Sequence, residues 1–309
     1  MLGEFATASQ QTLKAAIGCR GIGLHSGERV GITLHPAPPD AGIVFRRQGS
    51  AATIRASWAN TVPSSLCTTL SNGEGTTIGT VEHLMAALAG TAIDNAIVEV
   101  CGPEVPIMDG SAEPFLFLIA CAGIVEQDAA RRAIKVLKPI TVIEDGGTAM
   151  LLPDHGFSMS FEIDFDNPLI RRQEACLFFD TETFKTELSR ARTFGLLDEV
   201  DRLRAAGFAR GGSLANAVVV GRDHVLNAGG LRYSDEFVRH KLLDAFGDLY
   251  LAGGPLLGCF RGVRSGHAHT RRLLAALFAD SDAWCYTVLS RGIDLCGVEG
   301  QDQLQLAGD

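Results

Sequence analysis

Hydrophobic and polar positions in the first part of the chain follow the periods of short strands and helices. Residues 30–34 alternate as a half-buried strand, and an apolar run follows over 95–100. Helical spacing of apolar residues begins after Thr80, a residue type that caps helices, and ends at Gly90. We therefore expect strands over 30–34 and 95–100, and helices over 81–89 and 115–122.

The remainder of the chain shows the same mixture of periods. We expect strands over 134–137, 140–143, 149–152, 159–165 and 217–220, a polar connection over 184–192, and helices over 196–206, 234–251 and 270–279. A charged run over 126–132 separates the two parts, so we predict an N-terminal domain of residues 1–127 and a C-terminal domain of residues 128–309. Strands and helices do not alternate regularly in either part, which indicates the α+β class.

Composition and charge narrow the classes of function. The 309 residues are 46% hydrophobic and 20% charged, with a formal net charge of −9. This acidic balance disfavours nucleic acid and anionic membrane surfaces as partners. No secretory signal and no apolar run of membrane-spanning length is visible. None of the eight cysteines forms a C-x-x-C pair, so we expect reduced thiols and a cytoplasmic location.

Three polar residues recur at every fourth position inside the apolar run over 234–251. His240, Asp244 and Asp248 would lie on one stripe of a helix that Ser234 caps. Burying an imidazole and two carboxylates is costly unless a charge lies against them, and a divalent metal ion is the obvious candidate. The same spacing also fits a helix with one solvated edge, and spacing alone does not separate these interpretations.

Two further segments carry candidate chemistry. Glu82 and His83 begin the first helix, where the His can bind a metal and the Glu can take a proton from metal-bound water. His267 lies in a glycine-containing turn before a helix, which suits acid–base work. Taken singly, each segment is better explained by surface groups and satisfied imidazoles. The nearby Lys241 and Arg264 fit either a phosphate site or solvated cations.

Six segments taken together resemble one known family. They are residues 21–27 (GIGLHSG), 80–84 (TVEHL), 106–112 (PIMDGSA), 190–195 (RARTFG), 237–244 (FVRHKLLD) and 265–268 (SGHA). Their content and order, from about residue 12 to residue 285, are similar to those of the UDP-3-O-acyl-N-acetylglucosamine deacetylases, the zinc amidases of lipid A biosynthesis. One such motif is weak evidence, whereas six in order are highly specific.

The resemblance implies an architecture and a metal. Each of two domains would be a small sheet packed against helices, a two-layer sandwich, with the active site at the domain interface. His83, His240 and Asp244 would hold one catalytic zinc ion per chain. Three protein ligands leave a coordination position for water, as a catalytic zinc requires.

The resemblance also implies catalytic roles outside the metal ligands. Glu82 would be the general base that deprotonates the water. His267, kept protonated, would donate to the leaving amine, and Asp248 would orient and charge-stabilise His267. Thr193 would help to hold the tetrahedral oxyanion beside the metal.

The implied reaction removes the N-acetyl group of UDP-3-O-((R)-3-hydroxyacyl)-N-acetylglucosamine and gives UDP-3-O-acyl-glucosamine and acetate, the committed step of lipid A biosynthesis. Lys241 and Arg264 match family positions that can supply cations for the diphosphate. Phe165 is expected to contact the sugar or uridine, and Phe194 the substrate. The hydrophobic passage for the acyl chain maps onto residues 196–219, and its expected lining residues are Val200, Gly212, Ser213 and Val219.

Some features depart from the family pattern. His269 stands where an apolar residue is more usual and adds an imidazole near the cleft, and Cys67 is expected to be a buried bystander or an inhibitory-metal ligand. Residues 1–9 are expected to be a disordered extension, and the tail from 287 to 309 matches nothing. Two rivals stay open: a zinc hydrolase of this architecture with another amide substrate, and a nucleotide- or RNA-binding scaffold. We expect a monomer.

Overall fold

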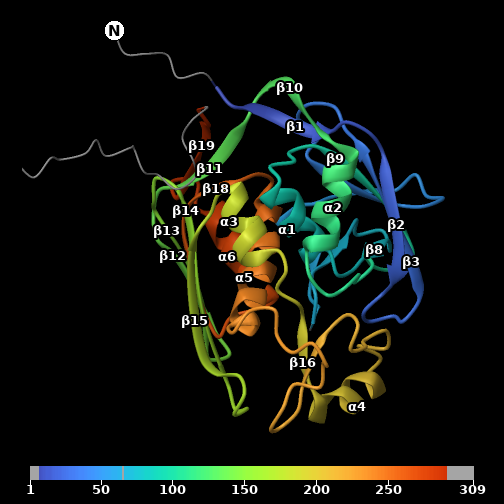
Figure 1. The fold of residues 1–309 in the computed structure, drawn as a ribbon. Helices are drawn as coiled ribbons and strands as arrows, with labels where there is room; N and C mark the ends of the chain where they lie inside the picture. The colour runs from blue at the N-terminus through green and yellow to red at the C-terminus, as the bar shows by residue number, and fades with distance from the viewer. Residues whose placement is uncertain (1–6, 65, 291–309) are drawn as a thin grey trace, which may run out of the picture.

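The structure, a computed structural model, describes residues 7–64 and 66–290. Two β-sheets form the outer layers and the main helices lie between them, so that the order across the molecule is sheet, helices, sheet (Figure 1). Both halves mix strands and helices, which confirms the α+β class predicted from the sequence. None of the helices in the described part of the chain has the length and apolarity that a bilayer crossing requires.

A five-stranded sheet forms the outer layer of the N-terminal half. Its strands, in spatial order, are β2 (Ile17–Ile22), β3 (Arg29–Pro36), β9 (Ala96–Cys101), β4 (Ile43–Arg47) and β5 (Thr53–Arg55). β3 runs antiparallel to β2 and β9, whereas β4 runs parallel to β9. Ile32, Leu34 and Val98 alternate with more exposed residues and are buried, because alternate side chains of a strand point to opposite faces of its sheet.

Two helices cover the inner face of this half. They are α1 (Glu82–Gly90) and α2 (Glu113–Ala122), and a short turn and small sheet precede them: η1 (Trp58–Asn60), β6 (Thr61–Val62), β7 (Thr69–Ser71) and β8 (Thr77–Ile78). α1 is buried at every residue except Ala89, which explains why its sequence after the first turn is wholly small or apolar. Glu82 and His83 are its two buried polar residues.

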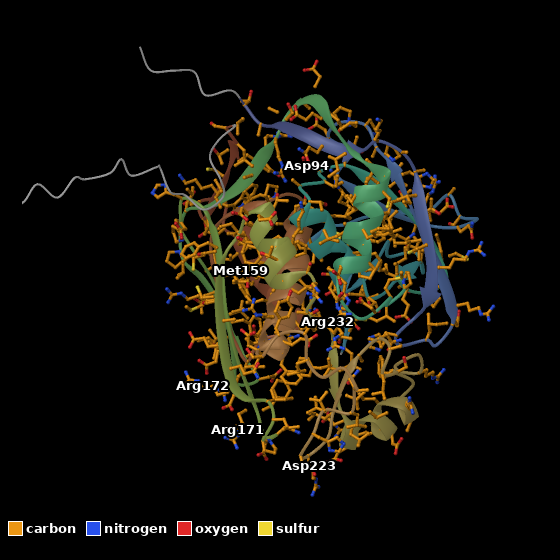
Figure 2. The ribbon with its side chains drawn as sticks, in the orientation of Figure 1. Asp94, Met159, Arg171, Arg172, Asp223 and Arg232 are labelled. Atoms are coloured by element: carbon orange, nitrogen blue, oxygen red, sulfur yellow. The ribbon has the colours of Figure 1, made fainter. Side chains whose placement is uncertain are left out.

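The C-terminal half contributes a seven-stranded sheet. Its strands are β12 (Ile140–Glu144), β13 (Gly147–Leu152), β18 (Leu256–Val263), β11 (Arg132–Val136) and β19 (Trp284–Val288), with β14 (Phe157–Phe165) and β15 (Arg171–Phe178) branching from β18. β18 runs parallel to β11 and β14 and antiparallel to β13. Met159 of β14 lies inside the molecule, whereas Arg171 and Arg172 of β15 lie at its rim (Figure 2).

The inner face of this sheet is covered by α5 (Glu236–Leu249) and α6 (His267–Ala279). α5 also packs directly on α1, so the two halves meet helix to helix (Figure 1). A Cβ atom on Gly247 of α5 would overlap the carbonyl oxygen of Glu82 in α1. Glycine at this position therefore lets the two backbones approach at the turn of α5 that lies between Asp244 and Asp248.

A small lobe extends from one end of the molecule. It consists of β16 (Phe194–Leu196), α4 (Leu197–Ala205) and β17 (Val218–Val220), and β16 pairs in parallel with β17 (Figure 1). No residue of α4 is buried, and Leu197 and Leu214 expose large apolar side chains. The lobe is thus an open appendage to the core, with a mostly charged helix and two exposed leucine side chains.

The predicted domain boundary falls inside a strand. β10 (Ile124–Ala130) contains Gln127 and pairs antiparallel with β1 (Ser9–Leu13). The buried apolar residues of both halves also form one continuous core. The division into domains 1–127 and 128–309 therefore stays a prediction.

The start of the chain differs from expectation where it is described, and the start of the C-terminal tail lies in a strand. Ser9 begins a strand and Thr7 forms a β-bridge with Ser290, so the expected disordered extension does not include residues 7–9. β19 includes the first residues of the tail that matched nothing. Residues 1–6 and 291–309, including Cys296, lie outside the described residues.

The predicted helix caps are wrong. Thr80 has a φ of 56°, and its hydroxyl donates to Glu104 Oε2 at 2.7 Å instead of capping α1. Ser234 does not cap α5, which begins at Glu236 after Asp235 without a side-chain capping bond. At Thr80, the tertiary partner Glu104 takes the hydroxyl that would otherwise cap the helix.

Several other segments differ from the expected elements, and strands β1, β2, β4, β5 and β18 were not predicted at all. The short helix α3 (Thr181–Thr183) directly precedes the polar connection expected over 184–192. The connection itself begins with the π-helical turn η2 (Phe184–Leu188), in which Phe184 and Leu188 are fully buried. The ring of Phe184 fills the space beside Gly90. The edge strand β15 was not expected, because its polar sequence lacks a strong apolar period. The 3-10 turn η3 (Tyr250–Ala252) extends α5.

Candidate functional site

α1 and α5 bring three candidate metal ligands to one point. His83 comes from α1, and His240 and Asp244 come from α5. The Nε2 atoms of His83 and His240 lie 3.4 Å and 3.3 Å from Asp244 Oδ1, and all three ligand atoms lie within 4.8 Å of one another. We call these three buried residues the metal cluster. Two imidazole nitrogens and a carboxylate oxygen, withdrawn from water at this spacing, fit one divalent cation.

The protonation of the metal cluster suits metal binding. His240 Nδ1 donates to the carbonyl oxygen of Ala191 at 3.0 Å, which leaves Nε2 as the free lone pair. Burial lowers the pKa of His240 to about 4, so the ring is neutral near pH 7. Burial would raise the pKa of Asp244, but His240 and Lys241 hold it well below its usual value. His240 and Asp244 are therefore available to a metal ion as a neutral imidazole and a carboxylate.

Lys241 lies beside the metal cluster and is not free. Its Nζ donates to Asp244 Oδ2 at 2.8 Å, and the side chain is 20% exposed. Burial would lower the pKa of Lys241, but the Asp244 carboxylate raises it. Lys241 is thus a buried cation at the metal cluster with a small exposed surface.

Glu82 is held next to the metal cluster by the start of α1. The backbone N–H of Thr68 donates to its Oε2 at 3.1 Å, and only 4% of the residue is exposed. Burial raises the pKa of Glu82 to about 7. A carboxylate with that pKa can both accept and release a proton near neutral pH.

His267 faces Glu82 from the other side. It is the first residue of α6, one turn earlier than the expected helix, and its Nε2 lies 3.9 Å from Glu82 Oε1. Its Nδ1 contacts Asp248 Oδ2 at 2.6 Å, and the Thr68 hydroxyl donates to Asp248 Oδ1 at 2.6 Å. Burial would lower the pKa of His267, but Asp248 raises it to about 10. His267 is therefore a protonated imidazole with Nε2 directed toward Glu82.

A cavity of about 220 Å³ opens beside His267. Thr68, Asp248 and Cys67 are among its lining residues. Cys67 is buried, and its Sγ lies 3.5 Å from Ser64 Oγ and 3.6 Å from Thr69 Oγ1. Among the described residues it is not grouped with the metal cluster.

Three phenylalanine rings lie together, and one of them, that of Phe194, is beside His240. The ring of Phe194 lies 5.6 Å from that of Phe165, 5.0 Å from that of Phe237 and 6.4 Å from that of His240, measured between centroids. Thr193 precedes Phe194; its N–H donates to the Gly110 carbonyl, and its own carbonyl accepts from Val218 N–H. The backbone of Thr193 is thus fixed on both sides.

The other expected substrate residues lie farther along the surface. Arg264 is exposed, has a φ of 47° and comes three residues before His267. Val200 lies on α4, Gly212 and Ser213 on the loop after it, and Val219 opposite Gly195 in the lobe. Because β16 carries both Gly195 and Phe194, the lobe is continuous with the site.

His269 has a different place from the one expected. It is buried, and its Nε2 contacts the Glu144 carbonyl oxygen at 2.9 Å. His269 therefore joins the first turn of α6 to the β12–β13 hairpin and does not face the metal cluster.

Sequence reasoning missed two groups that the site uses. Thr68 contacts both Glu82 and Asp248, but no spacing pattern marks it, because it reaches them across 14 and 180 residues. His25, from the glycine-rich segment 21–27, has both ring nitrogens buried without a hydrogen-bond partner. Burial lowers the pKa of His25, and the charges of Glu104 and Glu82 oppose this shift. Only its place in a matching motif could have drawn attention to His25.

The amino-acid sequence is similar to known proteins over most of its length. Residues 10–279 match the family model described as LpxC, UDP-3-O-acyl N-acetylglycosamine deacetylase. A protein of Saccharophagus degradans named UDP-3-O-acyl-N-acetylglucosamine deacetylase is 51% identical over 279 residues, which cover 89% of this chain and 92% of the relative. A protein of the same name from Chromohalobacter salexigens shows the same identity and coverage. The chain therefore belongs to the UDP-3-O-acyl N-acetylglycosamine deacetylase family.

Proposed function

We propose that the protein is a zinc-dependent amidohydrolase that removes the N-acetyl group of UDP-3-O-((R)-3-hydroxyacyl)-N-acetylglucosamine in lipid A biosynthesis. The products are UDP-3-O-acyl-glucosamine and acetate. The observation that carries the proposal is that Glu82 and His267 lie next to the metal cluster in a protein of this family. Glu82 has a pKa of about 7 and can act as a base, whereas His267, with a pKa of about 10, is protonated and can act as an acid.

The donor set of two imidazoles and one carboxylate fits zinc as well as ferrous iron, and the family resemblance favours zinc. Zinc sites with catalytic activity use three nitrogen or oxygen ligands and keep one position open, and His83, His240 and Asp244 would supply the three. A zinc ion bound there would supply Lewis acidity for the activation of water and the polarisation of the amide carbonyl.

Different residues around the metal cluster carry out the separate proton transfers of the reaction. Glu82 takes the proton from the attacking water, for which its pKa of about 7 is suited. Thr193 stabilises the oxygen of the tetrahedral adduct. His267 gives its Nε2 proton to the nitrogen of the leaving amine, and Asp248 holds the ring by its Nδ1. The C–N bond then breaks, and acetate and the free amine result.

The substrate would extend from the metal cluster in two directions. The diphosphate and uridine would lie toward Lys241 and Arg264, with Phe165 and Phe194 beside the sugar or uridine. The acyl chain would enter the lobe along Val200, Gly212, Ser213 and Val219, where apolar surface is open.

Metal analysis and acetate release test the proposal together. We expect about one zinc per purified chain, loss of activity on chelation, and recovery with added zinc. His240→Ala and Asp244→Ala should weaken zinc retention, because each removes a ligand. Acetate release should be measured from the UDP-3-O-acyl substrate and from an analogue with a shortened acyl chain.

Each result has a defined meaning. A protein without zinc whose activity zinc does not restore would exclude the zinc mechanism. Equal rates of acetate release from both substrates would indicate a hydrolase with a different substrate preference. Binding of nucleotide or RNA that substitutions of Glu82 and His83 do not alter would indicate a non-catalytic scaffold. The cytoplasmic location and the monomeric state expected from the sequence stay predictions.

A further inference from the structure

One segment of backbone connects the metal cluster with the predicted oxyanion residue. Residues 191–193 follow η2 and lead into β16. The carbonyl of Ala191 accepts a hydrogen bond from His240 Nδ1 at 3.0 Å. Thr193 follows two residues later and directly precedes Phe194, the first residue of β16. Whatever fixes this segment therefore fixes the orientation of a metal ligand and the place of Thr193.

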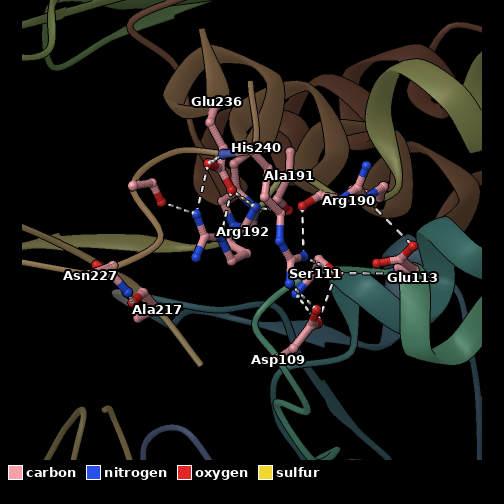
Figure 3. A network of polar contacts seen from close by, with 12 residues as sticks. Asp109, Ser111, Glu113, Arg190, Ala191, Arg192, Ala217, Asn227, Glu236 and His240 are labelled. Carbon is pink, nitrogen blue, oxygen red and sulfur yellow. Dashed lines mark hydrogen bonds and ion pairs between the residues drawn. The ribbon is translucent and has the colours of Figure 1, made fainter. Parts of the chain in front are cut away.

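An ion pair grips the residue between them. Arg192 donates to Glu236 Oε1 through its backbone N–H at 3.0 Å and its Nε at 2.8 Å, and to Oε2 through Nη2 at 3.1 Å. Figure 3 shows Arg192 and Glu236 directly beside Ala191 and His240. Glu236 is completely buried and the Arg192 side chain is 12% exposed, so water screens this pair weakly.

Helical spacing makes the two contacts a single clamp. Glu236 and His240 are four residues apart on α5 and so lie on one face, one turn apart. Glu236 holds Arg192 and His240 holds Ala191, which are consecutive in the chain. α5 thus aligns the segment at two adjacent points, and a shift of Arg192 must displace the Ala191 carbonyl from His240.

Further bonds stabilise the clamp from outside. Glu236 Oε2 also accepts from Arg232 N–H at 2.6 Å, and the Arg232 guanidinium donates to the Arg190 carbonyl at 3.0 Å and to Asp109 Oδ2 at 2.8 Å. These bonds satisfy every oxygen of the buried carboxylate. They also connect the segment to the N-terminal half through Asp109.

We infer that the Arg192–Glu236 ion pair is a positioning device for the metal cluster: it holds residues 191–193 in the register that presents the Ala191 carbonyl to His240 and Thr193 to the substrate. The inference rests on the proposed function only in taking His240 as a metal ligand. Neither residue of the pair touches the metal cluster itself. Their effect is carried by the hydrogen bond that fixes the tautomer and ring orientation of His240.

Zinc affinity of conservative variants tests this inference. Glu236→Gln keeps the shape and an acceptor oxygen but loses the charge, and Arg192→Lys keeps the charge but loses the two-point contact. We expect each to weaken zinc binding by about 10–100-fold, measured by competition with a chelator. The visible spectrum of the cobalt-substituted protein should also change, because the orientation of a nitrogen ligand changes.

The same helix offers a matched control. Asp235 pairs with Arg239 at 2.6 Å, next in sequence to the clamp, but this pair contacts Glu187 and not residues 191–193. Asp235→Asn should keep wild-type zinc affinity within about twofold and an unchanged cobalt spectrum, since it removes a partly exposed pair of the same type. Thermal unfolding of the metal-free proteins shows whether a variant has merely lost stability.

The outcomes separate this inference from the proposed function. The inference would be overturned if Glu236→Gln and Arg192→Lys both bound zinc as tightly as Asp235→Asn. If His240→Ala abolished zinc binding in the same experiment, the metal site itself would stand. A wild-type protein without zinc affinity would overturn both. If Glu236→Gln does not fold, Arg192→Lys alone decides.

Discussion

Glu82 and His267 face each other, and the pKa of each is raised above its ordinary value. Burial is the cause of the shift at Glu82 only. Burial raises the pKa of Glu82 to about 7 and outweighs the opposite effect of His267, whose Nε2 lies 3.9 Å away. His267 is buried as well, which lowers its pKa, but the Asp248 carboxylate at 2.6 Å reverses the effect and raises it to about 10. Two titratable groups shifted apart in this way are typical of an acid–base pair.

Glu82→Gln should lower turnover by roughly 10²–10⁴-fold while zinc stays bound, because the change removes the base but no metal ligand. Steady-state kinetics together with metal analysis of the same sample would measure both effects. His267→Ala should behave similarly, since it removes the acid. A Glu82→Gln rate within about tenfold of wild type would refute the general-base role.

Asp248→Asn should move the alkaline limb of the pH–rate profile to lower pH. The acid works only when His267 is protonated, so turnover falls as the pH rises through the pKa of His267. Removing the carboxylate that raises this pKa brings the fall to lower pH. The profile of kcat/KM for wild type and variant measures the shift, and an unmoved limb would show that another group controls it.

At the scale of elements, the site depends on the close approach of α1 and α5. α1 carries Glu82 and His83, and α5 carries His240 and Asp244, so the distance between the two helices sets the distance between the ligands. Gly247 lies against the backbone of Glu82 and allows this approach.

Gly247→Ala should therefore destabilise the protein and weaken metal binding together. The methyl group would collide with the Glu82 carbonyl, and overpacking of this kind costs about 1–3 kcal/mol, occasionally more. Alanine also favours a helix over glycine by about 1 kcal/mol, so a net loss of stability requires that the collision dominate.

Urea unfolding and zinc competition measure the two effects of Gly247→Ala. Gly229→Ala is the matched control, because nothing lies within 4 Å of a Cβ atom at Gly229. A Gly247→Ala protein as stable as the control variant, with unchanged zinc affinity, would show that α1 and α5 can separate without effect on the site.

At the scale of the whole molecule, one ion pair joins the two halves beside the site. Asp109 of the N-terminal half pairs with Arg232 of the C-terminal half at 2.8 Å, and Figure 2 shows Arg232 between the two. Burial would raise the pKa of Asp109, but hydrogen bonds from Arg232 and Ser111 hold it below its ordinary value of 3.8. A carboxyl group with a lowered pKa stabilises the fold above its ordinary pKa and loses this contribution as the pH falls through the folded-state pKa.

Asp109→Asn should therefore lower the free energy of unfolding at pH 7 by about 1–2 kcal/mol and by less below about pH 4, where wild type loses the same contribution. Urea unfolding at both pH values measures the difference. Asp198→Asn, which breaks an exposed pair with Arg222, should change stability by less than about 0.5 kcal/mol. An equal loss for Asp109→Asn at both pH values would contradict the charge-based account.

The elements that the sequence predicted best have strong internal periods. The helix around His240 and the strands around Ile32 and Val98 were expected within a few residues of their bounds, because their apolar spacing is local information. The cap at Thr80, the edge strand β15 and the buried turn η2 were not, because each depends on partners distant in the chain. The cap expected at Ser234 was also wrong.

The sequence by itself determined the fold class, the family resemblance and the candidate residues, since composition, period and motif are properties of the chain order. It could place His240 and Asp244 one turn apart, because helix geometry fixes that spacing. The family resemblance grouped His83 with them, but only the tertiary structure brings the three ligand atoms within 4.8 Å of one another. Only the tertiary structure, too, links Glu82 with Asp248 through Thr68 and places Arg192 and Glu236 beside the carbonyl that orients His240. The physical reason is that such contacts arise from the packing of α1 on α5, which no local period encodes.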